Sequence, residues 1–162
     1  MAAAGGMRFA MDIDDIDRKL LTLLQSDDRL ALNDLSKKTG VAASTINDRI
    51  KRLVRNGVIT GFHARVAPES LGIDLLAFML VGWSDARVEA PFLDKIRKSP
   101  AVLECHHVTG AWNYLLKVRI KNTRELETFL ANVVKGVKGV ERTETLIALS
   151  TAKEIWALDV AR

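Results

Sequence analysis

The sequence predicts an α+β protein with an N-terminal winged helix-turn-helix followed by a ferredoxin-like βαββαβ sandwich. Up to residue 66, apolar residues recur at helical spacing in three short stretches. From residue 73 onward, the apolar runs follow the order β-α-β-β-α-β. Positive charge is also uneven, because residues 37–66 hold seven Lys/Arg and one acid, whereas residues 67–162 hold thirteen Lys/Arg and twelve acids. The first part therefore carries a concentrated positive field, which suits a phosphate backbone.

Three helices and a hairpin are predicted in the N-terminal part. Asp14 is placed to cap an amphipathic helix that runs to about residue 25. A shorter helix is expected over 31–39 and a third over 42–56, each followed by a glycine. The β-prone stretch 58–66 predicts a hairpin or strand pair, which would form the wing.

The C-terminal part alternates between strand-like and helix-like patterns. A buried strand is indicated where the run IDLLAFMLVGW stands, and later stretches alternate in the way of half-buried strands. Strands are predicted at 73–83, 102–109, 113–121 and 140–149, and helices at 88–98 and 123–134. Trp156 and Leu158 follow the last strand, where they would add an edge strand or pack on a partner.

These elements divide the chain into two domains. We expect residues 1–11 to be a disordered leader, because they lack the basic start and sustained apolar run of a signal peptide. Residues 12–66 are the winged helix-turn-helix and 67–72 a linker. Residues 73–162 are the predicted effector-binding and oligomerisation domain.

The third predicted helix has the pattern of a DNA recognition helix. Ile46, Ile50 and Leu53 fall at i, i+4 and i+7, so they would anchor it on the first two helices. Polar side chains on the other face could reach base edges in a major groove, and arginine pairs bidentately with guanine. The predicted DNA-binding residues are Ser44, Thr45, Asp48, Arg49, Arg52 and Arg55.

Several other classes of protein are disfavoured. No stretch approaches 18 consecutive apolar residues, so no membrane span is expected. Cys105 is the only cysteine, which excludes an internal disulfide and favours a cytoplasmic protein. Adjacent His106 and His107 would point to opposite faces of a strand, so we expect no metal site, and no cofactor motif is present. No nucleophile context or phosphate loop indicates an enzyme, although a small ferredoxin-like enzyme stays an alternative.

Four stretches together resemble the Lrp/AsnC family of feast/famine transcription regulators. The resemblance covers Asp14 to about Glu154. It rests on IDDIDRKLLTLLQSDDR, DLSKKTGVAASTINDRIKRLVRNGVITGF, VLECHHVTGAWNYLLKV and GVERTETLIAL. It implies an N-terminal DNA-binding domain and a ferredoxin-like domain that dimerises, assembles into octamers and binds amino acids between subunits.

The chain departs from the family pattern in two places. Ala31 and Ala42 stand where relatives often have serine, so two helices lack a capping side chain, which costs about 1 kcal/mol per helix. Many relatives carry Gly-Asp-aromatic-Asp in the effector loop, whereas this chain has Gly-Ala-Trp-Asn and therefore lacks both acids. A ligand with an uncharged side chain is accordingly favoured.

The predicted effector site lies at a subunit interface beside this loop. Trp112 could stack on a ligand or merely fill the dimer interface, and both alternatives stay open. Loop N–H groups could hold a carboxylate, and by resemblance the end of the last strand adds polar groups from a neighbouring subunit. The predicted effector-binding residues are Val108, Thr109, Gly110, Ala111, Trp112, Asn113, Ser150 and Thr151.

The expected partners are double-stranded DNA, an amino-acid-like effector and further copies of the chain. The apolar runs at 73–83 and 140–149 exceed what one small sandwich needs. We therefore expect symmetric dimers through the sheet and higher even assemblies. The alternative function is an architectural DNA-wrapping protein without a small-molecule effector, which the loss of both loop acids favours.

Overall fold

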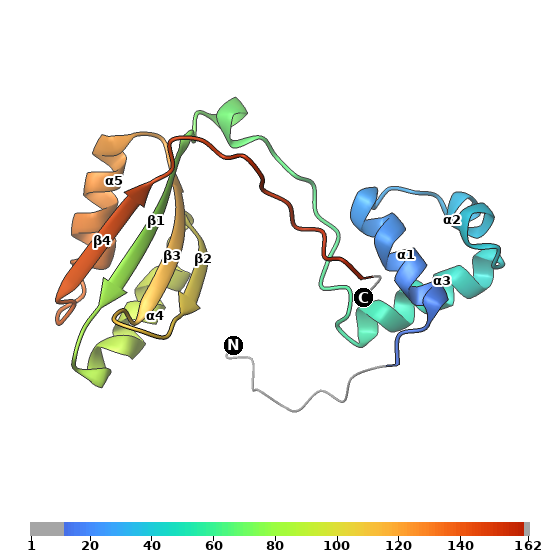
Figure 1. Ribbon diagram of the computed structural model, residues 1–162, viewed down its shortest axis with the longest axis horizontal. Helices are drawn as coiled ribbons and strands as arrows, with labels where there is room; N and C mark the ends of the chain where they lie inside the picture. The colour runs from blue at the N-terminus through green and yellow to red at the C-terminus, as the bar shows by residue number, and fades with distance from the viewer. Residues whose placement is uncertain (1–11, 161–162) are drawn as a thin grey trace. The chain divides into compact units, whose positions relative to one another are not determined.

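The computed structural model describes residues 12–160, and the predicted leader, 1–11, lies outside them. These residues group into two compact units: a helical unit made of 12–65 together with 154–160, and a sheet unit, 66–153. In the helical unit, three helices pack around fully buried Leu20, Leu35 and Ile46 (Figure 1). They are α1 (Asp15–Ser26), α2 (Leu32–Thr39) and α3 (Ala43–Arg55), which confirms the three predicted helices.

The helix ends follow the predicted capping. Asp14 Oδ1 accepts a hydrogen bond from the Asp17 backbone N–H at 2.8 Å and so caps α1. Ala31 and Ala42 precede α2 and α3 without any side-chain cap. Gly40 ends α2 with a φ of +75°, a left-handed conformation in which residues with a Cβ are strained.

The predicted hairpin over 58–66 is wrong, because the structure has no strand there. The N–H groups of Val58 and Ile59 both donate to the Leu53 carbonyl, at 2.9 and 3.2 Å, and thereby close the end of α3. Beyond them the chain is extended and mostly exposed, and no ladder bonds form. A two-stranded ribbon is marginal by itself, and here the first N–H groups of the segment bond to α3 and not to a second strand.

The sheet unit has the predicted βαββαβ order. Its four antiparallel strands lie side by side in the order β2-β3-β1-β4. Two helices cover one face of the sheet (Figure 1). The elements are β1 (Leu75–Gly82), α4 (Glu89–Arg97), β2 (Val102–His107), β3 (Tyr114–Ile120), α5 (Thr123–Phe129) and β4 (Arg142–Ile147).

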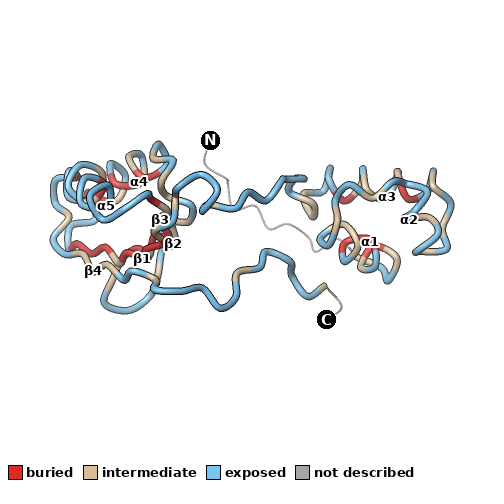
Figure 2. The backbone as a smooth tube through the Cα atoms, turned by 90° about the horizontal axis from the view of Figure 1, so that it is seen from above, coloured by how far each residue is buried: buried red, intermediate tan, exposed pale blue. Residues whose placement is uncertain are grey.

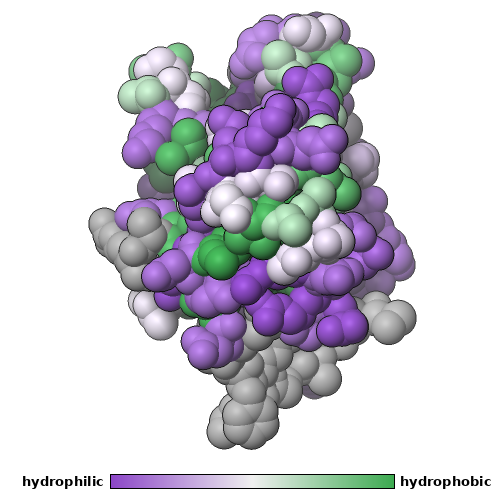
Figure 3. All heavy atoms as spheres, turned by 90° about the vertical axis from the view of Figure 1, so that its right-hand side faces the viewer, coloured by the Kyte–Doolittle hydropathy of each residue, from purple (hydrophilic) through white to green (hydrophobic). Residues whose placement is uncertain are grey.

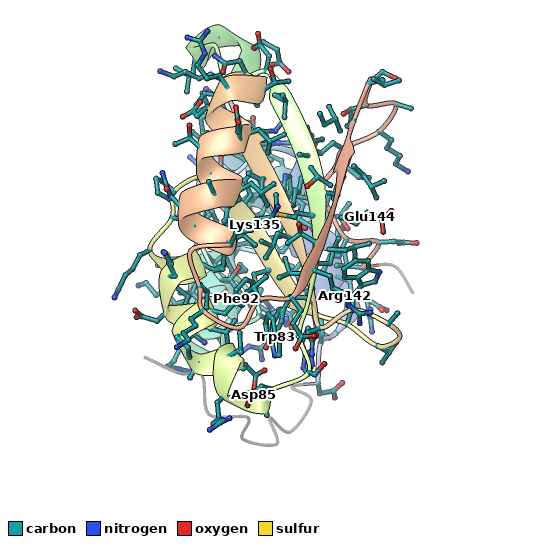
Figure 4. The ribbon with its side chains drawn as sticks, turned by 90° about the vertical axis from the view of Figure 1, so that its left-hand side faces the viewer. Trp83, Asp85, Phe92, Lys135, Arg142 and Glu144 are labelled. Atoms are coloured by element: carbon teal, nitrogen blue, oxygen red, sulfur yellow. The ribbon has the colours of Figure 1, made fainter. Side chains whose placement is uncertain are left out.

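The core of this unit lies between the sheet and its two helices. Alternate residues of β1 and β3, among them Met79 and Leu116, are fully buried on this side. Trp83, Phe92 and Tyr114 form an aromatic cluster with ring centroids 4.9–5.6 Å apart. Figure 2 shows the buried residues along β1 and α4, and Figure 4 shows Trp83 and Phe92 at the lower end of the sheet. The aromatic cluster therefore holds in place the end of the sheet where the 108–113 loop leaves β2 and enters β3.

The chain after β4 returns to the helical unit and packs on α1. The Gln25 side chain pairs with both backbone groups of Leu158, because its Nε2 donates to the carbonyl at 3.1 Å and its Oε1 accepts from the N–H at 2.7 Å. Arg18 donates to the Val160 carbonyl at 2.8 Å. The tail, 154–160, forms no strand, so the expected edge strand is absent, and its contact is with α1.

Candidate DNA-binding and effector sites

One stripe of α3 faces solvent along its whole length. Ser44, Asp48, Lys51 and Arg55 are all exposed and fall at i, i+4, i+7 and i+11, which places them on a single face. Thr45 is exposed at the edge of this stripe. The buried residues Ile46 and Leu53 lie on the opposite side, as predicted. We call the four exposed side chains at positions 44, 48, 51 and 55 the exposed stripe.

Two predicted DNA-binding residues, Arg49 and Arg52, lie beside the stripe and bind α1 instead. Arg49 Nη1 is 2.6 Å from Asp14 Oδ2 and 2.9 Å from Asp17 Oδ1. Arg52 Nη2 is 2.5 Å from Asp17 Oδ2. The Asp17 side chain is 0% exposed, so both of its oxygens depend on these guanidinium groups. The pair therefore joins α3 to α1.

The charges in this network also affect how Asp14 titrates. The hydrogen bond from the Asp17 backbone N–H, and then that from Arg49, hold the pKa of Asp14 below its ordinary value of 3.8. The same contact with Asp14 raises the pKa of Arg49. Because the folded-state pKa of Asp14 is lowered, its ionised form stabilises the fold above about pH 4, and this stabilisation is lost as the pH falls through the folded-state pKa.

The structure thus brings together only part of the predicted DNA-binding set. Ser44, Asp48 and Arg55 share the exposed stripe with Thr45 at its edge, while the two other arginines are held by α1. Lys51, which the sequence prediction omitted, lies at the centre of the stripe. Its spacing from residues 44, 48 and 55 was the signal that could have identified it. Figure 3 shows hydrophilic side chains around a smaller hydrophobic patch on the face that is turned toward the viewer.

The predicted effector loop connects β2 to β3 and leaves several backbone donors without partners. The loop is closed at its base, where the Val108 N–H donates to the Asn113 carbonyl at 3.0 Å. Gly110 has a φ of +102°, which permits the reversal between the strands. Among the described residues, nothing accepts a hydrogen bond from the N–H groups of 109–112. Such a run of donors can hold an anion.

Asn113 is largely committed to the fold. Its Oδ1 accepts from the Trp83 N–H at 2.8 Å, and its own N–H donates to the Val81 carbonyl at 2.9 Å. Only its side-chain NH2 group is left for a ligand. This residue therefore fixes the position of the loop at the end of β1, a role that its sequence context did not indicate.

Trp112 packs against a cation from the same chain. The Arg142 guanidinium carbon lies 5.0 Å from the centroid of the Trp112 ring, and the same side chain donates to the Ala111 carbonyl. Gly82 allows this approach, since a Cβ there would lie 2.6 Å from Arg142 Nε and 3.3 Å from Trp112 Cε3. Figure 4 shows Arg142 and Glu144 on β4, beyond the helix-covered side of the sheet.

Ser150 and Thr151 are exposed and lie at the other end of the sheet. The loop joins β3 where Tyr114 pairs with Val81, whereas β4 ends beside Ala77. The two pairings are four positions apart along β1, or about 13 Å of strand. Within one chain, the two parts of the predicted effector site are therefore not brought together (Figure 1).

The sheet face that carries no helices is apolar at its centre and polar toward β2. Phe78, Leu80 and Leu115 are half-buried there, and Leu146 on β4 is 51% exposed. On the β2 side, Glu104 contacts Lys117 and His106, each at 3.2 Å. We call this surface the open face.

The side chains of His106, His107 and Cys105 are not grouped into a metal site. His106 lies on the open face with Glu104, whereas the ring of His107 stacks on Tyr114 on the other side. Burial raises the pKa of the Cys105 thiol. Residues 12–160 contain no group of three or more side chains placed to hold a metal ion. No helix within that range has the length and apolar character to cross a bilayer.

Comparison with known proteins gives two family matches that together span most of the chain. Residues 13–60 match a winged helix-turn-helix DNA-binding family model. Residues 76–156 match the Lrp/AsnC ligand binding domain. The two matches correspond to the helical unit and the sheet unit described above.

Whole-length relatives agree with these matches. The HTH-type transcriptional regulator FL11 of Pyrococcus furiosus is 42% identical over 148 residues, which is 91% of this chain and 97% of the relative. The proline dehydrogenase transcriptional activator of Rhizobium radiobacter is 38% identical over 145 residues, 88% of this chain and 93% of the relative.

Solved structures show the same architecture. A Neisseria meningitidis transcriptional regulator in complex with L-Met superposes with a TM-score of 0.85 at 29% identity, covering 90% of this chain and 95% of the other. Escherichia coli AsnC superposes with a TM-score of 0.83 at 30% identity, covering 88% and 95%. Because residues 13–60 match a winged helix-turn-helix domain and residues 76–156 match the Lrp/AsnC ligand binding domain, and because whole-length relatives are transcription regulators, the chain belongs to the Lrp/AsnC family of DNA-binding transcription regulators and is not an enzyme.

Proposed function

We propose that this regulator binds operator DNA through the exposed stripe of α3 and responds to an amino acid or related metabolite with an uncharged side chain. The effector would bind between subunits, at the 108–113 loop of one and at Ser150 and Thr151 of another. The observation that carries the proposal is the loop itself, which offers unpartnered N–H donors and no carboxylate.

The chemistry of the loop favours an α-carboxylate with a neutral side chain. The N–H groups of 109–112 would hold the carboxylate, and Gly110 leaves room for its approach. A cationic side chain would find the Arg142 guanidinium close by and no acid within the loop. The Neisseria meningitidis relative was solved with L-Met, whose side chain is uncharged, and this supports the same ligand class here.

The placement of the two halves supports a site between subunits. The loop and Ser150 lie at opposite ends of one sheet, so one chain cannot close around a small ligand with both. A two-fold axis perpendicular to the strands would bring the loop end of one sheet to the other end of its partner. The proposed effector site is therefore a product of dimerisation.

We infer that the open face is the surface through which subunits pair. It combines the apolar centre at Phe78, Leu80 and Leu146 with a polar side at Glu104. An exposed apolar patch rimmed by polar groups is typical of an interface. Family resemblance extends this pairing to even-numbered assemblies, including an octamer.

Placing a charge on the open face should separate the subunits. Leu146→Arg should reduce the mass measured by light scattering at micromolar concentration, because burying a guanidinium in the apolar part of the interface costs its hydration. The control is Glu127→Arg, at an exposed site on α5, which should leave the mass unchanged. A wild-type monomer at this concentration would contradict the inference.

Removing the Trp112 ring should abolish the response to effector. A saturating neutral amino acid should raise the melting temperature of the wild-type protein by about 5–11 °C, because it stabilises the native state by about 2.7 kcal/mol at 100 times its Kd. Trp112→Ala should lose this shift while keeping its affinity for DNA. A melting screen with L-methionine and the other common amino acids measures both proteins.

Trp156→Ala is the matched control, since this tryptophan lies in the tail and outside the loop. It should keep the full shift. A wild-type preference for lysine or arginine would overturn the neutral-ligand assignment. The absence of a shift with any amino acid would instead favour an architectural DNA-wrapping role. Loss of assembly in Trp112→Ala would make the ring an interface filler.

A further inference from the structure

Asp48 is the one acid within the basic segment 37–66, and it lies in the middle of the exposed stripe. Ser44 stands one turn before it, and Lys51 and Arg55 follow it on the same face. A surface that approaches a polyanion gains affinity from every cation and loses affinity with every unpaired anion. A carboxylate in this position therefore opposes binding unless it meets a hydrogen-bond donor on the DNA.

The cations near Asp48 do not neutralise it. Lys51 and Arg52 lie three and four residues further along α3, the two spacings at which side chains on a helix meet. Arg52 is directed to Asp17 on α1 instead, with an N–O distance of 2.5 Å. Among residues 12–160, no side chain forms an ion pair or hydrogen bond with the Asp48 carboxylate.

The same network occupies two of the three arginines of α3. Arginine is the side chain that most often recognises guanine, but Arg49 and Arg52 are both held by the acids of α1. At the N-terminal half of α3, where a recognition helix meets base edges, the stripe presents Ser44 and Asp48. The two cations of the stripe, Lys51 and Arg55, lie closer to the C-terminal end of α3, where they can reach phosphates.

From this arrangement we propose that Asp48 reads a cytosine in the operator by accepting a hydrogen bond from its N4 amino group in the major groove. The carboxylate of an ionised aspartate only accepts hydrogen bonds, and cytosine presents a single donor there. Guanine and thymine present only acceptors at the corresponding positions and repel the carboxylate. Adenine has an N6 donor, but its N7 acceptor lies beside that donor and repels the second carboxylate oxygen, so cytosine is favoured over adenine as well. The inference rests on DNA contact by α3 and specifies a base that this contact selects.

The test is selection of binding sites from a random duplex library with wild-type protein, Asp48→Ala and Asp48→Asn. Wild-type sites should carry a C·G pair at one position of each half-site. Asp48→Ala should lose the preference at that position alone, by about fivefold to tenfold, and should bind random DNA more tightly than wild type. Asp48→Asn should change the preference there to adenine, which asparagine contacts bidentately.

Asp15→Ala is the matched control, because Asp15 is an exposed acid on α1 without a partner among the described residues. It changes the net charge by the same amount and should leave every selected position unchanged. If Asp48→Ala selects the wild-type sequence at all positions, Asp48 reads no base and the proposal is overturned. If wild-type protein enriches no sequence at all, operator recognition by α3 fails, which is a different result from an unchanged preference in the mutant.

Discussion

Replacing Asp17 with alanine is expected to lower the free energy of unfolding of the helical unit by about 3–5 kcal/mol. The Asp17 side chain is fully buried and accepts hydrogen bonds from Arg49 at 2.9 Å and Arg52 at 2.5 Å. Its removal leaves two guanidinium groups facing α1 without their common partner. Arg52 Nε is already buried without a hydrogen bond, so this site has no spare acceptor to offer.

Urea denaturation followed by circular dichroism measures this loss. The control is Asp15→Ala, two residues earlier in the same helical turn, where the side chain is exposed and the change should be below about 0.5 kcal/mol. Asp17→Asn keeps the shape but loses the charge, so its stability should lie between the two. An Asp17→Ala protein as stable as the control would show that the ion pairs do not hold α3 on α1.

The double variant Lys51→Ala/Arg55→Ala is expected to bind DNA of any sequence roughly 30-fold more weakly at 0.15 M salt. Both cations lie on the exposed stripe, and neither forms an ion pair within residues 12–160. Each phosphate contact multiplies the DNA association constant by roughly the molar salt concentration raised to the power −0.9. At 0.15 M salt, two such contacts together change the association constant by about 30-fold. Gel-shift titrations with a selected duplex and a random duplex measure the loss for both DNAs.

Arg49→Ala is the informative comparison for this prediction. It removes one positive charge from the same helix, where the double variant removes two, and the side chain that it removes is 21% exposed and paired with Asp14 and Asp17. At a temperature where the variant is folded, it should bind both duplexes within about twofold of wild type. A loss of about fivefold or more, the amount expected for one phosphate contact at this salt concentration, would return Arg49 to the DNA-contacting set.

The fold was predictable because its elements are encoded by local patterns. Apolar residues at helical spacing located α1 to α3, and the alternation of apolar runs gave the strand order of the sheet unit. Asp14 could be identified as a cap from its position alone. The stretch 58–66 has strand-forming residues, but a strand also needs a neighbour, and that requirement is absent from the local sequence.

The functional side chains were predictable only where periodicity decides exposure. The spacing of Asp48 and Arg55 along α3 places both on one face, and the same reasoning applied to Lys51 would have added it. The role of Arg49 depends on acids about thirty residues earlier in the chain, and helical spacing within α3 carries no information about them. Likewise, Gln25 contacts only the backbone of Leu158, so no side-chain pattern in the tail could have predicted this contact.

In the effector loop, too, some features were predictable from the sequence and others depend on residues far away in the chain. Its position could be predicted from the family motif, and its unpartnered N–H groups are consistent with the proposed role. The use of Asn113 to fix the end of β1 depends on the antiparallel register of β1 and β3. The separation of Ser150 from the loop follows from the order and direction of the strands, which the local sequence does not specify.

We propose that α3 is divided between the exposed stripe, which contacts DNA, and two arginines, Arg49 and Arg52, which hold the helix on α1. The salt dependence of DNA affinity tests it most directly, with fluorescence anisotropy titrations of wild-type protein, Arg55→Ala and Arg49→Ala. The slope of log affinity against log salt should become less steep by about 0.9 for Arg55→Ala and should not change for Arg49→Ala. A slope that changes for Arg49→Ala and not for Arg55→Ala would contradict this division.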